Sequence, residues 1–158
     1  MNYEIMLRPI TKEDTENIVR WRNSEHVLEN FLDKTLITPE SHICWLENFV
    51  NTNKAVQYII LANEIPIRTT FVKNIQTDPE LGIFIGEKEY LGKGIGTMAE
   101  KLTIKEYFKN HDKFIIGRML VDNIAANKAV QKLGFELVEM YRNEEGLEVN
   151  LYHHKGFE

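Results

Sequence analysis

The sequence predicts a mixed α/β (α+β) fold, with a mostly antiparallel, twisted sheet of about seven strands and helices on both faces. The hydrophobic pattern gives the order strand, two helices, three strands, helix, strand, helix and two strands. A tight turn at 63–64 predicts a hairpin between two of these strands. The chain has 158 residues, of which 43% are hydrophobic, and this suffices for one core, so we expect a single domain over 1–158.

Each strand is predicted from a short apolar or alternating run that ends at a turn residue. The first strand stops at Pro9, and the last two strands flank the turn sequence NEEG. The predicted strands cover 3–10, 55–62, 65–72, 80–86, 114–121, 135–142 and 147–154.

Each helix is predicted from apolar residues at helical spacing together with capping residues. The predicted helices cover 11–23, 38–51, 97–109 and 123–133, with a second short helix or a turn at 24–32. Thr11 and Thr38 are the expected N-caps, Pro39 lies in a first turn, and Gly134 ends the last helix. The residues expected to face the core are Ile43, Leu46, Phe49 and Val50 in the helix at 38–51, and Met98, Leu102, Tyr107 and Phe108 in the helix at 97–109.

Composition narrows the function classes. The net charge of −5 argues against broad binding to nucleic acid or to a membrane. Cys44 is the only cysteine, so no internal disulfide can form; we expect a buried small residue and a reducing, cytoplasmic location. The N-terminal segment does not have the pattern of a signal peptide, and no apolar run approaches the length of a membrane span. No zinc pattern occurs, so no metal is expected.

Three glycines, Gly92, Gly94 and Gly96, lie between the predicted strand at 80–86 and the helix that follows. Unpaired amides at a helix start, together with the helix dipole, bind anions, and glycines allow a phosphate to approach the backbone. The loop therefore predicts a phosphate or pyrophosphate site; the alternative is a flexible surface loop. The spacing does not fit the dinucleotide fingerprint or the Gly-Lys-Ser/Thr phosphate loop.

The strand ELGIFIGE, the loop LGKGIGTMA and the segment VDNIAANKAVQKLGF resemble the core of the GCN5-related N-acetyltransferase (GNAT) family. The loop of that family reads Arg/Gln-x-x-Gly-x-Gly/Ala, and Gly94 and Gly96 fill its glycine positions. The resemblance extends over nearly the whole chain and implies that acetyl-coenzyme A is the co-substrate.

The resemblance also implies which residues contact the coenzyme. The backbone of the fourth strand would hold the pantetheine arm, the loop amides would hold the diphosphate, and one helix would supply an asparagine and a lysine. These residues are Ile83, Phe84, Ile85, Leu91, Gly92, Lys93, Gly94, Ile95, Gly96, Thr97, Asn123, Asn127 and Lys128, with Lys132 as a further cation. The sequence departs from the family at Leu91, where an arginine or glutamine is usual, and at Arg68, where relatives usually have glycine.

The resemblance further implies a mechanism in which the amine attacks the thioester directly. Glu80 lies where some relatives carry the catalytic base, and the alternative is a solvated acid. The positions of the usual proton donors hold Val130 and Ala126, which cannot donate. Tyr90, Tyr141, Tyr152 and His153 remain as candidate donors.

The acceptor is expected to be a small-molecule amine or a peptide N-terminus. The first helices resemble two branches of the family: one acetylates ribosomal-protein N-termini, and the other acetylates nucleotide-linked amino sugars. The sugar branch implies Arg22, Asn23 and His42 as substrate-binding residues, with Lys73 as a fourth. We favour a small molecule slightly; a coenzyme-binding module without catalysis and a nucleotide-dependent oxidoreductase are the alternatives. The sequence does not decide between a monomer and a homodimer.

Overall fold

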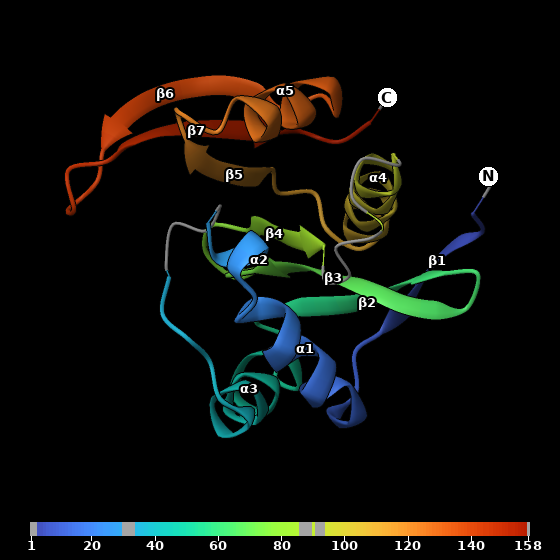
Figure 1. Ribbon diagram of the computed structural model, residues 1–158. Helices are drawn as coiled ribbons and strands as arrows, with labels where there is room; N and C mark the ends of the chain where they lie inside the picture. Colours follow the sequence, from blue (N-terminus) through green and yellow to red (C-terminus); the bar gives the residue numbers. More distant parts are fainter. Residues whose placement is uncertain (1–2, 30–33, 86–89, 91–93, 158) are drawn as a thin grey trace.

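The computed structural model describes residues 3–29, 34–85, 90 and 94–157. These residues form a seven-stranded sheet in the order β1-β2-β3-β4-β5-β7-β6 (Figure 1). Neighbouring strands are antiparallel except β4 and β5, which run parallel. The strands are β1 (Ile5–Pro9), β2 (Val56–Ala62), β3 (Ile65–Lys73), β4 (Glu80–Ile85), β5 (Ile115–Leu120), β6 (Glu136–Arg142) and β7 (Glu148–His154). The predicted fold class and the predicted order of helices and strands along the chain are therefore confirmed.

Helices cover both faces of the sheet. The elements on one face are η1 (Lys12–Asp14), α1 (Thr15–Arg22), α2 (Glu25–Leu28), α3 (Pro39–Trp45) and the π-helical turn η2 (Leu46–Val50). On the other face, α4 (Ile95–Phe108) and α5 (Ile124–Lys132) share one core with β3, β5 and β7. Figure 1 shows α1 and α3 on the opposite side of the sheet from α4. None of the helices in the described part of the chain is long and apolar enough to cross a membrane.

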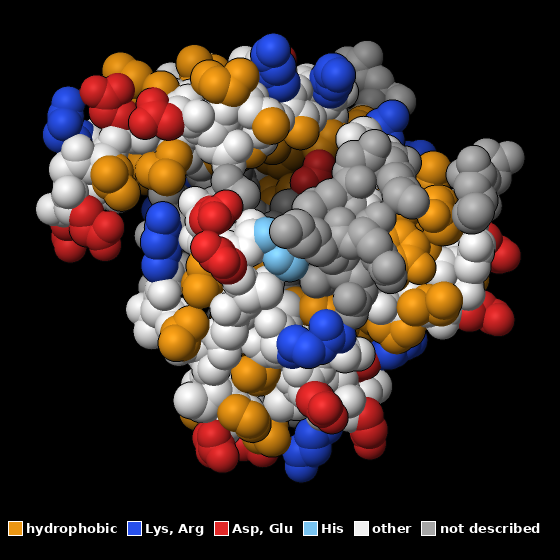
Figure 2. Space-filling model, viewed as in Figure 1, with side chains coloured by type: hydrophobic (Ala, Val, Ile, Leu, Met, Phe, Trp, Pro, Cys, Tyr) orange, Lys and Arg blue, Asp and Glu red, His pale blue; other side chains and the backbone are white. Residues whose placement is uncertain are grey.

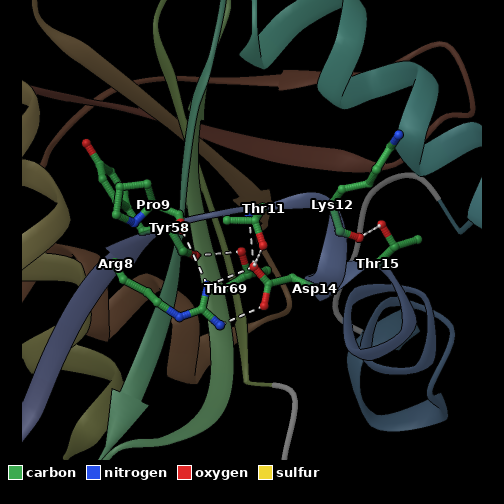
Figure 3. Close-up of polar contacts among 8 residues, drawn as sticks. All are labelled: Arg8, Pro9, Thr11, Lys12, Asp14, Thr15, Tyr58 and Thr69. Atoms are coloured by element: carbon green, nitrogen blue, oxygen red, sulfur yellow. Dashed lines mark hydrogen bonds and ion pairs between the residues drawn. The ribbon is translucent and has the colours of Figure 1, made fainter.

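A charged cluster fixes the passage from β1 to α1 (Figure 3). The Asp14 carboxylate accepts two hydrogen bonds from Arg8, at 2.8 and 2.7 Å, and one from the backbone N–H of Thr11, at 2.8 Å. Behind this cluster, Trp21 is buried in the core between α1 and β2. The cluster therefore anchors the helices that form one wall of the site.

The predicted helix at 38–51 exists, but its inward face is partly different. Thr38 caps it, because its side chain accepts a hydrogen bond from the Ser41 N–H at 3.0 Å. The last turn is π-helical, which rotates the residues that follow it. Phe49, expected in the core, is 41% exposed, and Cys44, expected to be buried, is also exposed. Leu46 is buried as predicted.

The inward face of α4 also differs from the prediction. Met98 is 49% exposed, whereas the buried residues of this helix are Ile95, Ala99, Glu100, Thr103, Ile104 and Tyr107. Two of them, Glu100 and Thr103, are polar. The prediction counted only apolar residues, so it placed the inward face of the helix too far toward Met98. The predicted end of α5 is confirmed: Gly134 follows it with a φ of +100°, a conformation that glycine adopts without strain.

Candidate active site

The two parallel strands of the sheet diverge. Among the described residues, β4 and β5 are in register at one pair, Glu80 with Ile116, and the Ile116 N–H donates to the Pro79 carbonyl at 2.7 Å. Beyond that pair, the backbone of 81–85 pairs with β3 alone. Ile83, Phe84 and Ile85 therefore present a free backbone edge toward the opening, where the pantetheine arm is predicted to lie. Figure 1 shows β5, β6 and β7 on one side of this opening.

A cavity of about 1240 Å³ fills the opening between the two halves of the sheet. Pockets for a single small ligand are commonly about 300 to 1,000 Å³, so this one has room for two substrates. Figure 2 shows the hollow, with acidic and histidine side chains near its mouth. Its wall combines residues of α1, α3, β3, β4, α4, β5, α5 and β6.

One end of the cavity is the start of α4. Gly94 has a φ of +74° and turns the chain into the helix, a conformation that favours glycine. Gly94, Gly96 and Thr97 line the cavity. The first-turn amides of a helix have no partner within it, and the first turn of α4 contains no acidic residue, so this end can hold an anion. The predicted contacts of Leu91, Gly92 and Lys93 lie outside the described residues.

The predicted contacts on α5 divide into two groups. Asn123 lines the cavity, and its side chain caps the helix by accepting from the Ala126 N–H at 3.2 Å. Asn127 is buried, and its amide is used within the protein: it donates to the Asn123 and Leu120 carbonyls and accepts from Asn150 and Tyr152. Asn127 thus ties α5 to β7, and a direct contact with the coenzyme stays a prediction.

Lys128 and Lys132 are exposed on α5, and neither lines the cavity. Ala126 and Val130 do line it, which places an apolar surface where relatives carry a proton donor. A contact of either lysine with the coenzyme's 3′-phosphate also stays a prediction.

Glu80 is buried at the start of β4 and lines the cavity. Arg118 of β5 binds both of its carboxylate oxygens, through Nε at 3.0 Å and Nη2 at 2.5 Å. The hydrogen bond that Arg118 donates to Glu80 raises the pKa of Arg118 despite partial burial, and Tyr141 adds to the effect. The guanidinium is therefore a permanent cation here.

Of the four candidate proton donors, Tyr141 lines the cavity. The hydroxyl of Tyr152 is committed to Asn127 at 2.6 Å, and His153 stacks on Phe114 with ring centroids 4.2 Å apart. Tyr90 packs edge-on against Tyr3. From the sequence, Tyr141 is one of four unranked candidate donors. The distance of Tyr141 from Arg118 depends on the pairing of β5, β6 and β7, so it could not be used to rank the candidates.

The other end of the cavity is lined by α1, α3 and β3. Arg22, His42 and Lys73 all line the cavity, and their contact with an acceptor stays a prediction. His42 is 5% exposed, its Nε2 has no hydrogen-bond partner, and burial lowers its pKa, so it is neutral at pH 7. Asn23 is not a lining residue: its amide donates to the Ile37 carbonyl and accepts from the Ile37 N–H, both at 2.8 Å.

A buried charged pair also lines the cavity, and no local sequence pattern predicted it. Arg68 of β3 is 3% exposed and Glu100 of α4 is 8% exposed. Burial lowers the pKa of Arg68 to about 10 and raises the pKa of Glu100 to about 7, and their mutual attraction opposes both shifts. Arg68 was noted only as a departure from glycine, and Glu100 was not singled out. Their contact joins positions distant in the chain.

Within the described part of the chain, no cluster of three or more histidine, cysteine, aspartate or glutamate side chains could hold a metal ion. The groups available for chemistry are therefore carboxylates, cations, a phenol, an imidazole and backbone amides.

Comparison with known proteins identifies the family. Residues 4–136 match the family model described as an acetyltransferase (GNAT) domain. The curated protein MJ1062 of Methanocaldococcus jannaschii, described as uncharacterized, is 33% identical over 156 residues, which cover 94% of this chain but 31% of that protein. The chain thus spans about a third of that relative's length.

Two solved structures share the fold. A domain from Methanocaldococcus jannaschii superposes with a TM-score of 0.80 at 27% identity, covering 97% of this chain and 100% of that one. Spermidine N-acetyltransferase from Vibrio cholerae, in complex with CoA and spermine, gives a TM-score of 0.83 at 15% identity and covers 95% and 94% of the two chains. The family-model match shows that the chain belongs to the GNAT acetyltransferase family, and the diverging strands and the glycine start of α4 agree with it.

Proposed function

We propose that the domain acetylates the primary amine of an anion-bearing small molecule, such as a nucleotide-linked amino sugar. The observation that carries this proposal is the buried imidazole of His42, whose Nε2 lacks a partner at the acceptor end of the cavity. A buried polar atom without a partner is costly, so a substrate oxygen or hydroxyl is a natural partner for it.

The charges at this end of the cavity support an anionic acceptor. Arg22 and Lys73 line it together with His42, and cationic side chains attract phosphate groups. A polyamine acceptor carries several positive charges and would be repelled by these cations, whereas Glu144 and Glu145 of the same lining would attract it. A peptide N-terminus could enter the cavity, but nothing in the lining provides a further reason for one.

We assign the proton acceptor role to Glu80. Its carboxylate lies at the point where β4 and β5 part, and each oxygen that Arg118 binds keeps a free lone pair. The amine must lose a proton to attack, and Glu80 would take it directly or through one water. Arg118 holds the carboxylate in one orientation, and a relay through water suits this geometry.

Acetyl-CoA supplies the thioester. In the proposed transfer, the amine nitrogen bonds to the acetyl carbon, the carbon–sulfur bond breaks, and its electron pair leaves on sulfur. The free backbone edge of β4 would donate to the carbonyl oxygen as charge builds there. Tyr141 is the side chain we assign to protonate the leaving sulfur, because it lines the cavity. A thiolate is also an acceptable leaving group in its own right.

The experiment is an assay of free thiol release with acetyl-CoA over matched acceptors: a nucleotide-linked amino sugar, the same sugar without its nucleotide, a polyamine and a short peptide with a free N-terminus. We expect saturable turnover on the nucleotide-linked sugar and a higher KM without the nucleotide. Turnover on the peptide alone would support acetylation of protein N-termini instead. Coenzyme binding without turnover on any amine would support a coenzyme-binding module.

A further inference from the structure

The interface between α4 and β3 contains charge where a helix packed on a sheet is normally apolar. Arg68 of β3 points toward α4. Two residues further along β3, the hydroxyl oxygen of Thr70 lies 2.7 Å from that of Thr103 in α4. Arg68 and Glu100 are both almost fully buried in this layer. Arginine is rarely so buried unless it is paired, and the desolvation cost is large, so the position calls for a compensating contact.

Arg68 lies directly beneath the start of α4. A Cβ built on Gly96 would lie 2.8 Å from Arg68 Nη1, and Arg68 supplies all three of the nearest atoms. The guanidinium therefore packs against the first turn of the helix, and Gly96 leaves the room it needs. The same turn carries the amides that face the cavity, which Arg68 also lines.

Two nitrogens of this guanidinium lack a partner. Arg68 Nε and Nη1 are buried without a hydrogen bond. Glu100 attracts the guanidinium across the interface, but no hydrogen bond joins these two described side chains. Unsatisfied donors on a buried cation are costly, and the contact that would satisfy them is an acceptor with negative charge. The cavity beside the start of α4 is where such an acceptor would come from.

We propose that Arg68 binds the diphosphate of coenzyme A from beneath the N-terminus of α4, and that Glu100 is its counter-charge when no coenzyme is bound. This assignment rests on coenzyme binding by the domain and is independent of the acceptor. It also accounts for Leu91 in the sequence, where the family usually carries a polar side chain, because Arg68 of β3 would supply such a contact.

The test is isothermal titration calorimetry of the whole chain with coenzyme A, dephospho-coenzyme A and pantetheine. At about pH 8, Arg68 carries its charge and Glu100 is ionised. Arg68→Met is expected to weaken both coenzymes by about ten- to a hundredfold, with equal factors for the two. Pantetheine, which has no phosphate, should bind the variant and the wild type equally. Arg142→Met is the matched control, because Arg142 is exposed and pairs with Glu148 on the β6–β7 hairpin.

A second variant separates charge from misfolding. Glu100→Gln removes a negative charge beside the diphosphate site, so it should tighten coenzyme A binding by a few fold, opposite to Arg68→Met. Weaker binding by both variants would mean that the pair is only structural and would overturn the proposal. Equal binding of coenzyme A by Arg68→Met and the wild type would also overturn it, as would a loss confined to coenzyme A but absent for dephospho-coenzyme A. A wild type that binds no coenzyme would instead contradict the proposed function.

Discussion

Arg118 grips both carboxylate oxygens of Glu80 across the point where β4 and β5 part, with Nε–Oε2 at 3.0 Å and Nη2–Oε1 at 2.5 Å. This ion pair joins the two halves of the sheet at the apex of the cavity. It therefore has two roles in our account: it fixes the angle between the strands, and it positions the carboxylate that we assign to accept the proton.

Glu80→Gln should separate binding from chemistry. The amide keeps the shape of the carboxylate but cannot accept a proton at neutral pH, so we expect kcat to fall by about a hundredfold or more. The KM for acetyl-CoA should change little, because the coenzyme is held at the other end of the cavity. Steady-state kinetics over a pH series measures both.

The control for this variant is Glu148→Gln, which breaks an exposed ion pair with Arg142 on the β6–β7 hairpin. It should behave as the wild type. An unchanged kcat in Glu80→Gln would remove Glu80 from the mechanism and leave Arg118 as a structural clamp.

His42→Ala should act on the acceptor alone. Loss of the buried imidazole removes one contact, so the KM for the anion-bearing amine should rise by about tenfold while the KM for acetyl-CoA stays the same. Initial rates with each substrate varied in turn measure the two constants. His26→Ala, which alters another histidine of the cavity wall, shows whether the effect is specific to His42. A rise in the KM for acetyl-CoA instead would place His42 near the coenzyme.

Glu100 should make the free energy of unfolding depend on pH. Burial raises its folded pKa to about 7, from 4.5. Between these values the folded carboxyl keeps a proton that the unfolded chain has released, so stability falls as the pH rises. One proton corresponds to a slope of at most about 1.4 kcal/mol per pH unit.

The measurement is urea unfolding at several pH values from about 5 to about 8, for the wild type and Glu100→Gln. The wild type should lose stability across this range relative to the variant, and the difference between them should level off above the folded pKa. Parallel curves would contradict a buried, ionisable Glu100.

Asp14 should stabilise the wall of the acceptor site. Although burial alone would raise its pKa, hydrogen bonds from Arg8 and Thr11 lower it, so its contribution is present above the unfolded pKa and is lost as the pH falls through the folded one. Asp14→Asn should cost about 2 kcal/mol at neutral pH, measured by urea unfolding, because it removes one partner of a partly buried ion pair. Glu16→Gln on the exposed side of α1 should change stability little.

Local patterns in the sequence were enough to predict the order of helices and strands along the chain and the glycine start of α4. The hairpin at 63–64, the cap at Thr38 and the left-handed residue Gly134 are all set by neighbouring residues, and the structure confirms each. Phe49 was placed wrongly, because it lies within the π-helical turn Leu46–Val50, where the chain departs from the 3.6-residue period on which the prediction rested.

The site was less predictable than the fold because its key contacts join distant segments. Glu80 was chosen from the family resemblance, but Arg118, its partner, lies 38 residues further along the chain and becomes visible only once β4 is paired with β5. Taken separately in the sequence, Arg68 is a cation in a strand and Glu100 is an acid in a helix. Charged side chains in such positions are usually solvated. Their burial follows from packing α4 on β3, which the sequence does not specify residue by residue.

The most direct test of the central claim follows the acetyl group itself. The protein is incubated with acetyl-CoA labelled in its acetyl group, a nucleotide-linked amino sugar and a short peptide with a free N-terminus, and the products are identified by mass spectrometry. Our account predicts that the label appears on the amine of the sugar, in step with thiol release, and that Glu80→Gln nearly abolishes it. Label found only on a peptide N-terminus, or only as free acetate, would contradict the account.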